Sequence, residues 1–221
     1  MPSRIHDIRT KMSEQELARW KAEFFEVHTP IALAECVQQF GSIVGDHAVD
    51  SSRAGFWRDA HLASNFGIHR KASRILMLGP ENDANHKIAP DFQIEVDGTW
   101  ARYELVEALP VGRRRSDEFR EDREAGGGKA RSDHVPNKTE LTEILSKAAA
   151  IKVAKSTIYS DCRGLVIKLS TWALLSDEAK EEVLTSGTEQ AGKIFGEVWV
   201  IDGSVTYLVW CDGHPAYRLQ R

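Results

Sequence analysis

Apolar residues recur every three or four positions through the first third of the chain, which is typical of amphipathic helices. Ser13 and Glu16, three residues apart, form a capping-box pattern ahead of the first such run. A second helix is predicted to begin near Pro30, and a third is predicted over residues 56–66. Residues 1–70 are therefore predicted to form an N-terminal helical segment packed on the core.

Alternation of apolar and polar residues replaces the helical spacing in the middle of the chain. Strands are predicted at 74–78 and 91–96, and the second of these ends at Asp97-Gly98, the dipeptide with a strong preference for a two-residue hairpin turn. The return strand covers residues 100–108. The turn makes Ala101 and Glu95 rough cross-strand partners.

The second half of the chain alternates helices with apolar strands. Thr139 is predicted to cap a helix that runs to about Lys155, and Ser176 to start another. Further strands are predicted at 163–169, 197–201 and 205–210. A strand–helix–strand step requires a parallel crossover, so the sheet is predicted to be mixed. We assign the chain to the α/β (α+β) class, with residues 71–221 forming the core.

Composition is that of an ordinary globular protein, with 42% hydrophobic and 28% charged residues. No apolar run reaches the roughly 18 residues of a membrane span, and the charged N-terminus lacks the apolar segment of a signal peptide. The three cysteines have no paired spacing, which favours reduced thiols. We therefore expect a cytoplasmic protein without a membrane partner.

Two carboxylates occupy positions that a hairpin would bring together. Asp91 opens the first strand of the hairpin, and Glu104 lies in the second. Hard divalent cations prefer carboxylate oxygens, so this pair is a candidate metal site. Glu107 is a rival to Glu104, but side chains alternate along a strand, so the two point to opposite faces and cannot share one site without a bulge.

Pro90-Asp91, followed in the return strand by Glu104-Leu105-Val106, resembles the bipartite motif of the PD-(D/E)XK nuclease superfamily. The predicted order of helix, hairpin, helix and strand is similar to the αβββαβ core of that superfamily. The resemblance covers roughly residues 74–170. It implies a restriction-endonuclease-like mixed β-sheet flanked by helices, with Mg²⁺ or Mn²⁺ held by Asp91 and Glu104 and hydrolysis of phosphodiester bonds in DNA. It also permits a homodimer, because many such nucleases cut both strands as dimers.

The chain departs from this motif at the lysine, whose position is occupied by Val106. In some members of the superfamily a lysine from the following helix takes its place. On a helical wheel, Lys152 and Lys155 fall in the apolar sector that begins at Leu141. Lysines on a core-facing stripe are unusual unless they are paired or belong to a site. The sequence therefore indicates Lys152 first and Lys155 second as the catalytic lysine.

A polar loop at 110–137 begins with Arg113, Arg114 and Arg115. Together with Lys147, at the edge of the apolar sector of the following helix, these arginines are candidate contacts for nucleic-acid phosphates. The alternative is a solvated loop, because acidic residues are interleaved with the basic ones.

A further metal ligand is expected from a helix ahead of the hairpin, because the superfamily often takes an additional acid from there. Glu35 is the candidate in this sequence. The alternative interpretation of Glu35 is an ordinary surface carboxylate.

Two other functions stay open at this point. The chain could keep the nuclease fold as a catalytically inactive binding or regulatory protein, which the missing motif lysine and the net charge of −4 both favour. It could instead be an unrelated α+β interaction protein. A sheet that does not place Asp91 beside Glu104 would establish the second of these.

Overall fold

Within residues 12–45, 55–79, 90–110, 135–158, 161–169 and 175–220, which the computed structural model describes, eight strands form one continuous sheet in chain order. The first four are β1 (Val27–His28), β2 (Arg74–Met77), β3 (Phe92–Val96) and β4 (Thr99–Ala108). The last four are β5 (Gly164–Leu169), β6 (Glu197–Asp202), β7 (Val205–Cys211) and β8 (His214–Gln220). The pairs β4–β5 and β5–β6 are parallel and the other pairs are antiparallel, which confirms the predicted mixed sheet.

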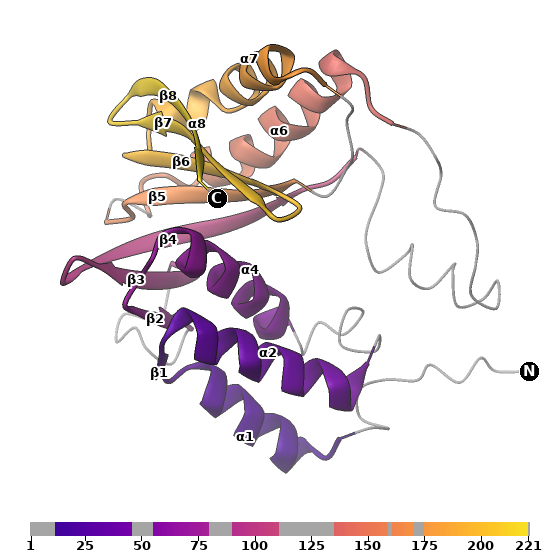
Figure 1. The fold of residues 1–221 in the computed structure, drawn as a ribbon, viewed down its shortest axis with the longest axis vertical. Helices are drawn as coiled ribbons and strands as arrows, with labels where there is room; N and C mark the ends of the chain where they lie inside the picture. The colour runs from indigo at the N-terminus through magenta and orange to yellow at the C-terminus, as the bar shows by residue number, and fades with distance from the viewer. Residues whose placement is uncertain are drawn as a thin grey trace, which may run out of the picture.

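Helices flank the sheet on both faces (Figure 1). One side carries α1 (Glu14–Phe24), α2 (Pro30–Val44) and α4 (Gly55–His69), which share an apolar core with β2, β3 and β4. The other side carries α6 (Lys138–Val153), α7 (Asp177–Gly187) and α8 (Glu189–Gly192), whose core includes β5, β6 and β7. None of the helices in the described ranges combines the length and the apolar character needed to cross a bilayer.

The helix starts follow local capping chemistry. The capping box predicted at Ser13 is confirmed: its hydroxyl accepts from the Glu16 backbone N–H at 3.2 Å, and its own N–H donates to the Glu16 carboxylate at 2.8 Å. The predicted cap at Thr139 is wrong. Asn137 caps α6 instead, because Glu140 closes a reciprocal box with it at 2.9 and 3.0 Å.

The hairpin of β3 and β4 sets the register on which the site depends. Asp97 and Gly98 adopt positive φ angles of 51° and 77°, as a two-residue primed turn requires. Ala101 consequently pairs with Ile94, one residue away from the expected Glu95. Because Phe92 pairs with Tyr103, extending the register by one step places Asp91 opposite Glu104.

Candidate metal centre

Asp91 and Glu104 lie on the same face of the sheet. The rings of Phe92 and Tyr103 stack 5.6 Å apart in the core on the α4 side, so the preceding Asp91 and the following Glu104 point to the α6 side. Oδ2 of Asp91 accepts a hydrogen bond from the Leu105 backbone N–H at 2.6 Å. Glu104 is only 1% exposed, whereas the Asp91 side chain is 31% exposed. The pair therefore combines one deeply buried carboxylate with one that solvent reaches.

Lys152 comes from the last turn of α6 and joins the two carboxylates. Its Nζ lies 3.4 Å from Oδ2 of Asp91 and also donates to Oε2 of Glu104. Leu145 and Ala148 on the same helix are buried against the sheet, and the helical repeat carries Lys152 to the end of that stripe. The structure thus brings together three of the residues that the sequence indicated, one from each of three segments.

Glu104 sits in an electrostatically unfavourable place. Burial raises the pKa of its carboxyl, the charge of Asp91 raises it further and Lys152 opposes both, which leaves the pKa at about 7. Oε1 of Glu104 is buried and has no hydrogen-bond partner among the described residues. A buried carboxylate oxygen without a donor is costly, and bound water or a cation is a usual explanation.

Asp59 is a further carboxylate that acts electrostatically with Asp91 and that the sequence analysis did not identify, although Asp59, Asp91 and Glu104 do not bring three ligand atoms within 4.8 Å of one another. It lies on α4, and burial followed by the charge of Asp91 raises its pKa to about 6. Glu35, the expected helical acid, is exposed on α2 instead, where its charge acts on Cys36. The reason is that α4 lies against β2, whereas α2 packs mainly on α4. The one available signal was the helical spacing around Asp59, which precedes the buried Ala60.

Glu107 points to the opposite face from Glu104, as the strand alternation predicts. It lines a separate cavity of about 430 Å³ together with Asp59 and Lys168, its partner in the β4–β5 register. Its charge also raises the pKa of Asp59. Asp59 therefore lines this cavity and also interacts electrostatically with Asp91.

The other sequence candidates lie away from the three-residue centre. Lys155 follows the C-cap Ala154 of α6 and is exposed. Lys147 is exposed as well, and its Nζ is 3.5 Å from the Glu143 carboxylate one turn earlier. Arg113, Arg114 and Arg115, with most of the 110–137 loop, fall outside the described residues.

A separate group of metal-ligating side chains joins α1, β1 and α2. One ligand atom each from Glu23, His28 and Cys36 lies within 4.8 Å of the others. Nε2 of His28 donates to the Glu23 carbonyl at 2.7 Å, and burial raises the pKa of the Cys36 thiol. Glu23 is exposed, and exposed groups of this kind are common without an ion. This group involves none of the residues around Glu104.

No protein-family model, curated protein or solved structure matches the chain. The functional argument therefore rests on the chemistry of the site and on the order of the elements that build it.

Proposed function

We propose that the chain is a metal-dependent nuclease of the PD-(D/E)XK type that hydrolyses phosphodiester bonds in DNA. The observation that carries the proposal is the position of Lys152, whose Nζ contacts both Asp91 and Glu104. Val106 occupies the motif lysine position on β4, and Lys152 supplies an ammonium group to the same two carboxylates from the following helix.

The order of elements around the centre supports the same proposal. From α4 through β2, β3, β4 and α6 to β5, the chain follows the αβββαβ order of the restriction-endonuclease-like core. The three central strands are antiparallel, and β5 returns parallel to β4 after α6. Asp91 lies at the start of β3 and Glu104 within β4, where that core carries its acidic pair.

The donor set suits a hard divalent cation. Asp91 and Glu104 would hold Mg²⁺ or Mn²⁺, with Asp59 close by, because such ions prefer carboxylate oxygens. The orphaned Oε1 of Glu104 and the mutual repulsion of the carboxylates are both relieved by added positive charge. The ion would polarise the scissile phosphate and lower the pKa of a bound water.

The protein's own residues then have distinct roles. Lys152 holds an ammonium group at the carboxylate pair, where it can orient the attacking water and offset charge that develops on the phosphate. The Leu105 backbone N–H fixes the orientation of Asp91 by donating to Oδ2. The 31% exposure of Asp91 leaves the centre open on the side from which a phosphate group could approach.

One observation favours the second candidate, a catalytically inactive nuclease-fold binding or regulatory protein. Lys152 already forms an ion pair with Glu104, and the resulting neutralisation could make the centre purely structural. In that case the centre should bind no divalent cation that depends on Asp91 and Glu104.

The two candidates are separated by incubating the full chain with plasmid DNA in Mg²⁺, in Mn²⁺ and in EDTA. We expect metal-dependent cutting that falls at least a hundredfold in Asp91→Asn and in Lys152→Met. The matched control is Lys193→Met, because Lys193 forms an exposed pair with Glu189 on α8 and should cut normally. Absence of cutting, together with absence of Mn²⁺ binding by calorimetry, would overturn the nuclease proposal.

A further inference from the structure

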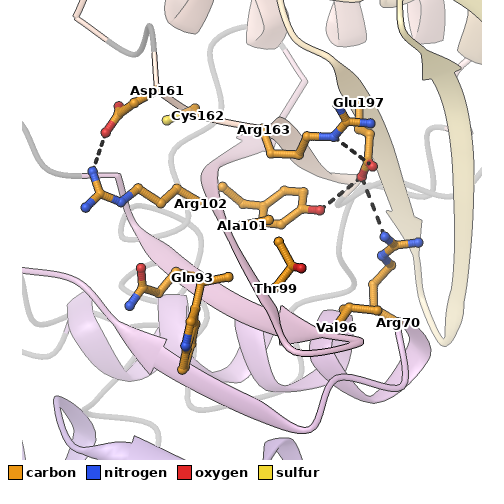
Figure 2. A pocket seen from close by; sticks show the side chains of 12 residues that line it. Arg70, Gln93, Val96, Thr99, Ala101, Arg102, Asp161, Cys162, Arg163 and Glu197 are labelled. Atoms are coloured by element: carbon orange, nitrogen blue, oxygen red, sulfur yellow. Dashed lines mark hydrogen bonds and ion pairs between the residues drawn. The ribbon is translucent and has the colours of Figure 1, made fainter.

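A cavity of about 710 Å³ opens at the end of β4 away from Glu107, and Arg102, two residues before Glu104, lines it (Figure 2). Arginine side chains reach it from three elements: Arg70 after α4, Arg102 on β4 and Arg163 before β5. Figure 2 shows Arg102 and Asp161 on one side of the cavity, with Glu197, Arg163 and Arg70 on the other. The two sides differ in how their charges are satisfied.

The side around Glu197 is a closed hydrogen-bond network. The Glu197 carboxylate accepts from the Tyr103 hydroxyl at 3.0 Å, from Trp199 Nε1 at 2.8 Å and from Arg163 Nε at 3.1 Å. The guanidinium of Arg70 lies 4.6 Å from the centre of the Trp199 ring. The Glu197 carboxylate is thus occupied by protein donors, although Nε of Arg70 is buried without a hydrogen-bond partner among the described residues.

The side around Arg102 is adjacent to the metal centre. Arg102 lies two residues before Glu104 on β4 and shares its face, which separates their Cα atoms by about 7 Å. Cys162 lines the same side of the cavity, and the charges of Glu104 and Asp91 contribute to raising its pKa. A spacing of two strand residues is close to the separation of successive phosphates along a nucleic-acid strand.

Arg102 is held loosely enough to exchange its partner. It donates through NH1 to Asp161, and the two side chains are 47% and 53% exposed. Ion pairs that are this exposed to solvent contribute little to stability, so a phosphate can displace Asp161 from Arg102 at little cost. A guanidinium group also offers a planar fork of donors that matches phosphate oxygens.

Trp100 and Gln93 extend the same face away from the metal centre. Trp100 precedes Arg102 by two residues and Gln93 is the cross-strand partner of Arg102, so all three side chains point to the α6 side. The helices on that side pack on β4 to β8. Trp100 and Gln93 are half-buried. The Arg74 guanidinium lies over one face of the Trp100 ring, 5.2 Å from its centre, so an unpaired base would stack on the other face of this half-exposed indole.

We propose that Arg102, Trp100 and Gln93 bind the nucleotide next to the scissile phosphate in a single-stranded stretch of DNA. Arg102 takes the neighbouring phosphate, and Trp100 stacks its base. Stacking on Trp100 needs a base that is not paired, which makes a single strand the substrate class. The placement of the scissile phosphate rests on the proposed function.

The test is fluorescence anisotropy with a labelled single-stranded oligonucleotide and the matching duplex, in EDTA so that no cutting occurs. We expect Arg102→Gln and Trp100→Leu each to weaken single-strand binding about tenfold. Arg102→Gln should also lower the slope of log affinity against log salt by about 0.7, the value for one lost phosphate contact on a single strand. Arg19→Gln is the matched control, because Arg19 is exposed on α1, on the opposite side of the sheet.

Asp161→Asn separates a lost contact from misfolding. It should strengthen single-strand binding by releasing Arg102, whereas a misfolded variant would bind more weakly. The proposal is overturned if the three variants bind like the parent chain, or if the duplex binds more tightly than the single strand. Binding that depends on Arg102 without metal-dependent cutting would refute the nuclease activity and leave a single-strand binding surface. Cutting without such binding would refute this surface alone.

Discussion

Two buried glutamates, one on each side of β5, differ in the hydrogen-bond donors that the fold supplies to them. Glu104 on β4 is 1% exposed and Glu197 on β6 is 8% exposed. Glu197 receives hydrogen bonds from tyrosine, tryptophan and arginine side chains. Within the described residues, Glu104 accepts a hydrogen bond from the Lys152 ammonium through Oε2, while its Oε1 has no partner and the carboxyl faces a second carboxylate, Asp91. The protein's own donors satisfy the Glu197 carboxylate, whereas the Glu104 carboxyl is left with an oxygen that has no donor among the described residues.

Glu95 shows that a carboxylate in this sheet can be held fully ionised. Both of its oxygens bind the Arg74 guanidinium at 2.6 Å, and Ser73 adds another donor at 2.7 Å. The hydrogen bonds from Arg74 lower the pKa of Glu95 to about 2. Burial is the first cause of the raised pKa of Glu104 and the charge of Asp91 is the second, and the single Lys152 partner does not outweigh them. At Glu95 the Arg74 and Ser73 donors outweigh burial, so the two carboxylates differ in how many donors the fold supplies.

The largest expected effect is on cleavage and falls on one of the two glutamates. Glu104→Gln should lower metal-dependent cutting by at least a thousandfold, because the buried ligand loses its charge. Glu197→Gln should keep cutting within about tenfold when assayed well below its melting temperature. Rates from a plasmid-nicking time course at saturating Mg²⁺ measure both. Equal losses in the two variants would remove the distinction between the glutamates.

The next effect is on stability and falls on the other glutamate. In Glu197→Gln the single amide oxygen can keep the Tyr103 and Trp199 hydrogen bonds only if the amide NH2 faces the Arg163 donor, and the carboxylate charge is lost, so the free energy of unfolding should drop by about 3 kcal/mol. Denaturant unfolding at pH 7 measures this change. Glu95→Gln is the matched control for loss of a paired, buried carboxylate. A drop under about 1 kcal/mol would mean that the network around Glu197 is not structural.

The pH dependence of stability should carry the signature of Glu104. Its pKa is about 7 in the folded chain and 4.5 as the reference value, so the carboxyl is protonated in both states at low pH and ionised in both above pH 7. Ionisation of Glu104 is less favourable in the folded state than in the unfolded state. The stability that the protonated Glu104 carboxyl contributes is therefore lost as the pH rises from about 4.5 to 7. The loss should be on the order of 2 kcal/mol.

Glu104→Gln isolates this contribution because the amide does not titrate. The free energy of unfolding of the parent chain, measured in EDTA relative to this variant, should fall between pH 4.5 and pH 8. Adding Mn²⁺ at pH 8 should stabilise the parent chain and not the variant. A parent-minus-variant difference that stays constant with pH would contradict the raised pKa.

A smaller effect tests whether Asp59 contributes to cation binding at Asp91 and Glu104. Asp59→Asn should weaken Mn²⁺ binding about tenfold at pH 7.5, because a nearby carboxylate that raises the negative potential at Asp91 is removed. Glu35→Gln is the control, because Glu35 is exposed on α2, and it should leave the affinity unchanged. Calorimetric titration of the full chain measures both. An unchanged affinity in Asp59→Asn would restrict the centre to Asp91 and Glu104.

Local chemistry made much of this centre predictable. Asp97-Gly98 fixed the hairpin because its turn needs positive φ at two successive residues, and the 3.6-residue repeat of α6 selected Lys152. The β8 strand was missed, although Asp212-Gly213 gives the same turn signal and has φ angles of 48° and 81°.

Other features could not be read from spacing. The two residues of β1 are too few to show any periodicity, and its pairing with β2 forms only in the assembled sheet. Asp59 sits next to buried Ala60, and many surface acids have such a neighbour, so its role depends on how α4 packs. The satisfied state of Glu197 depends on donors from β4, β6 and the segment before β5, which only the tertiary fold brings together.

The smallest effect is expected at Lys155, the second lysine that the helical wheel selected. Lys155→Met should change cutting less than twofold, whereas Lys152→Met should lower it at least a hundredfold. The two lysines share a helical sector, but α6 ends at Val153, so Lys155 follows the C-cap and is exposed. The backbone N–H of Lys155 bonds the Lys152 carbonyl at 3.0 Å, in the turn that leads the chain away from the helix axis.

Single-turnover cutting by the two variants, each compared with Lys193→Met, gives the measurement. A large loss in Lys155→Met with a small loss in Lys152→Met would mean that the ion pair of Lys152 with Glu104 only neutralises a buried charge. The unsatisfied oxygen of Glu104 would then need another explanation, and Glu104 would resemble Glu197 in role as well as in burial. The contrast between the two glutamates therefore depends on which of these neighbouring lysines the reaction requires.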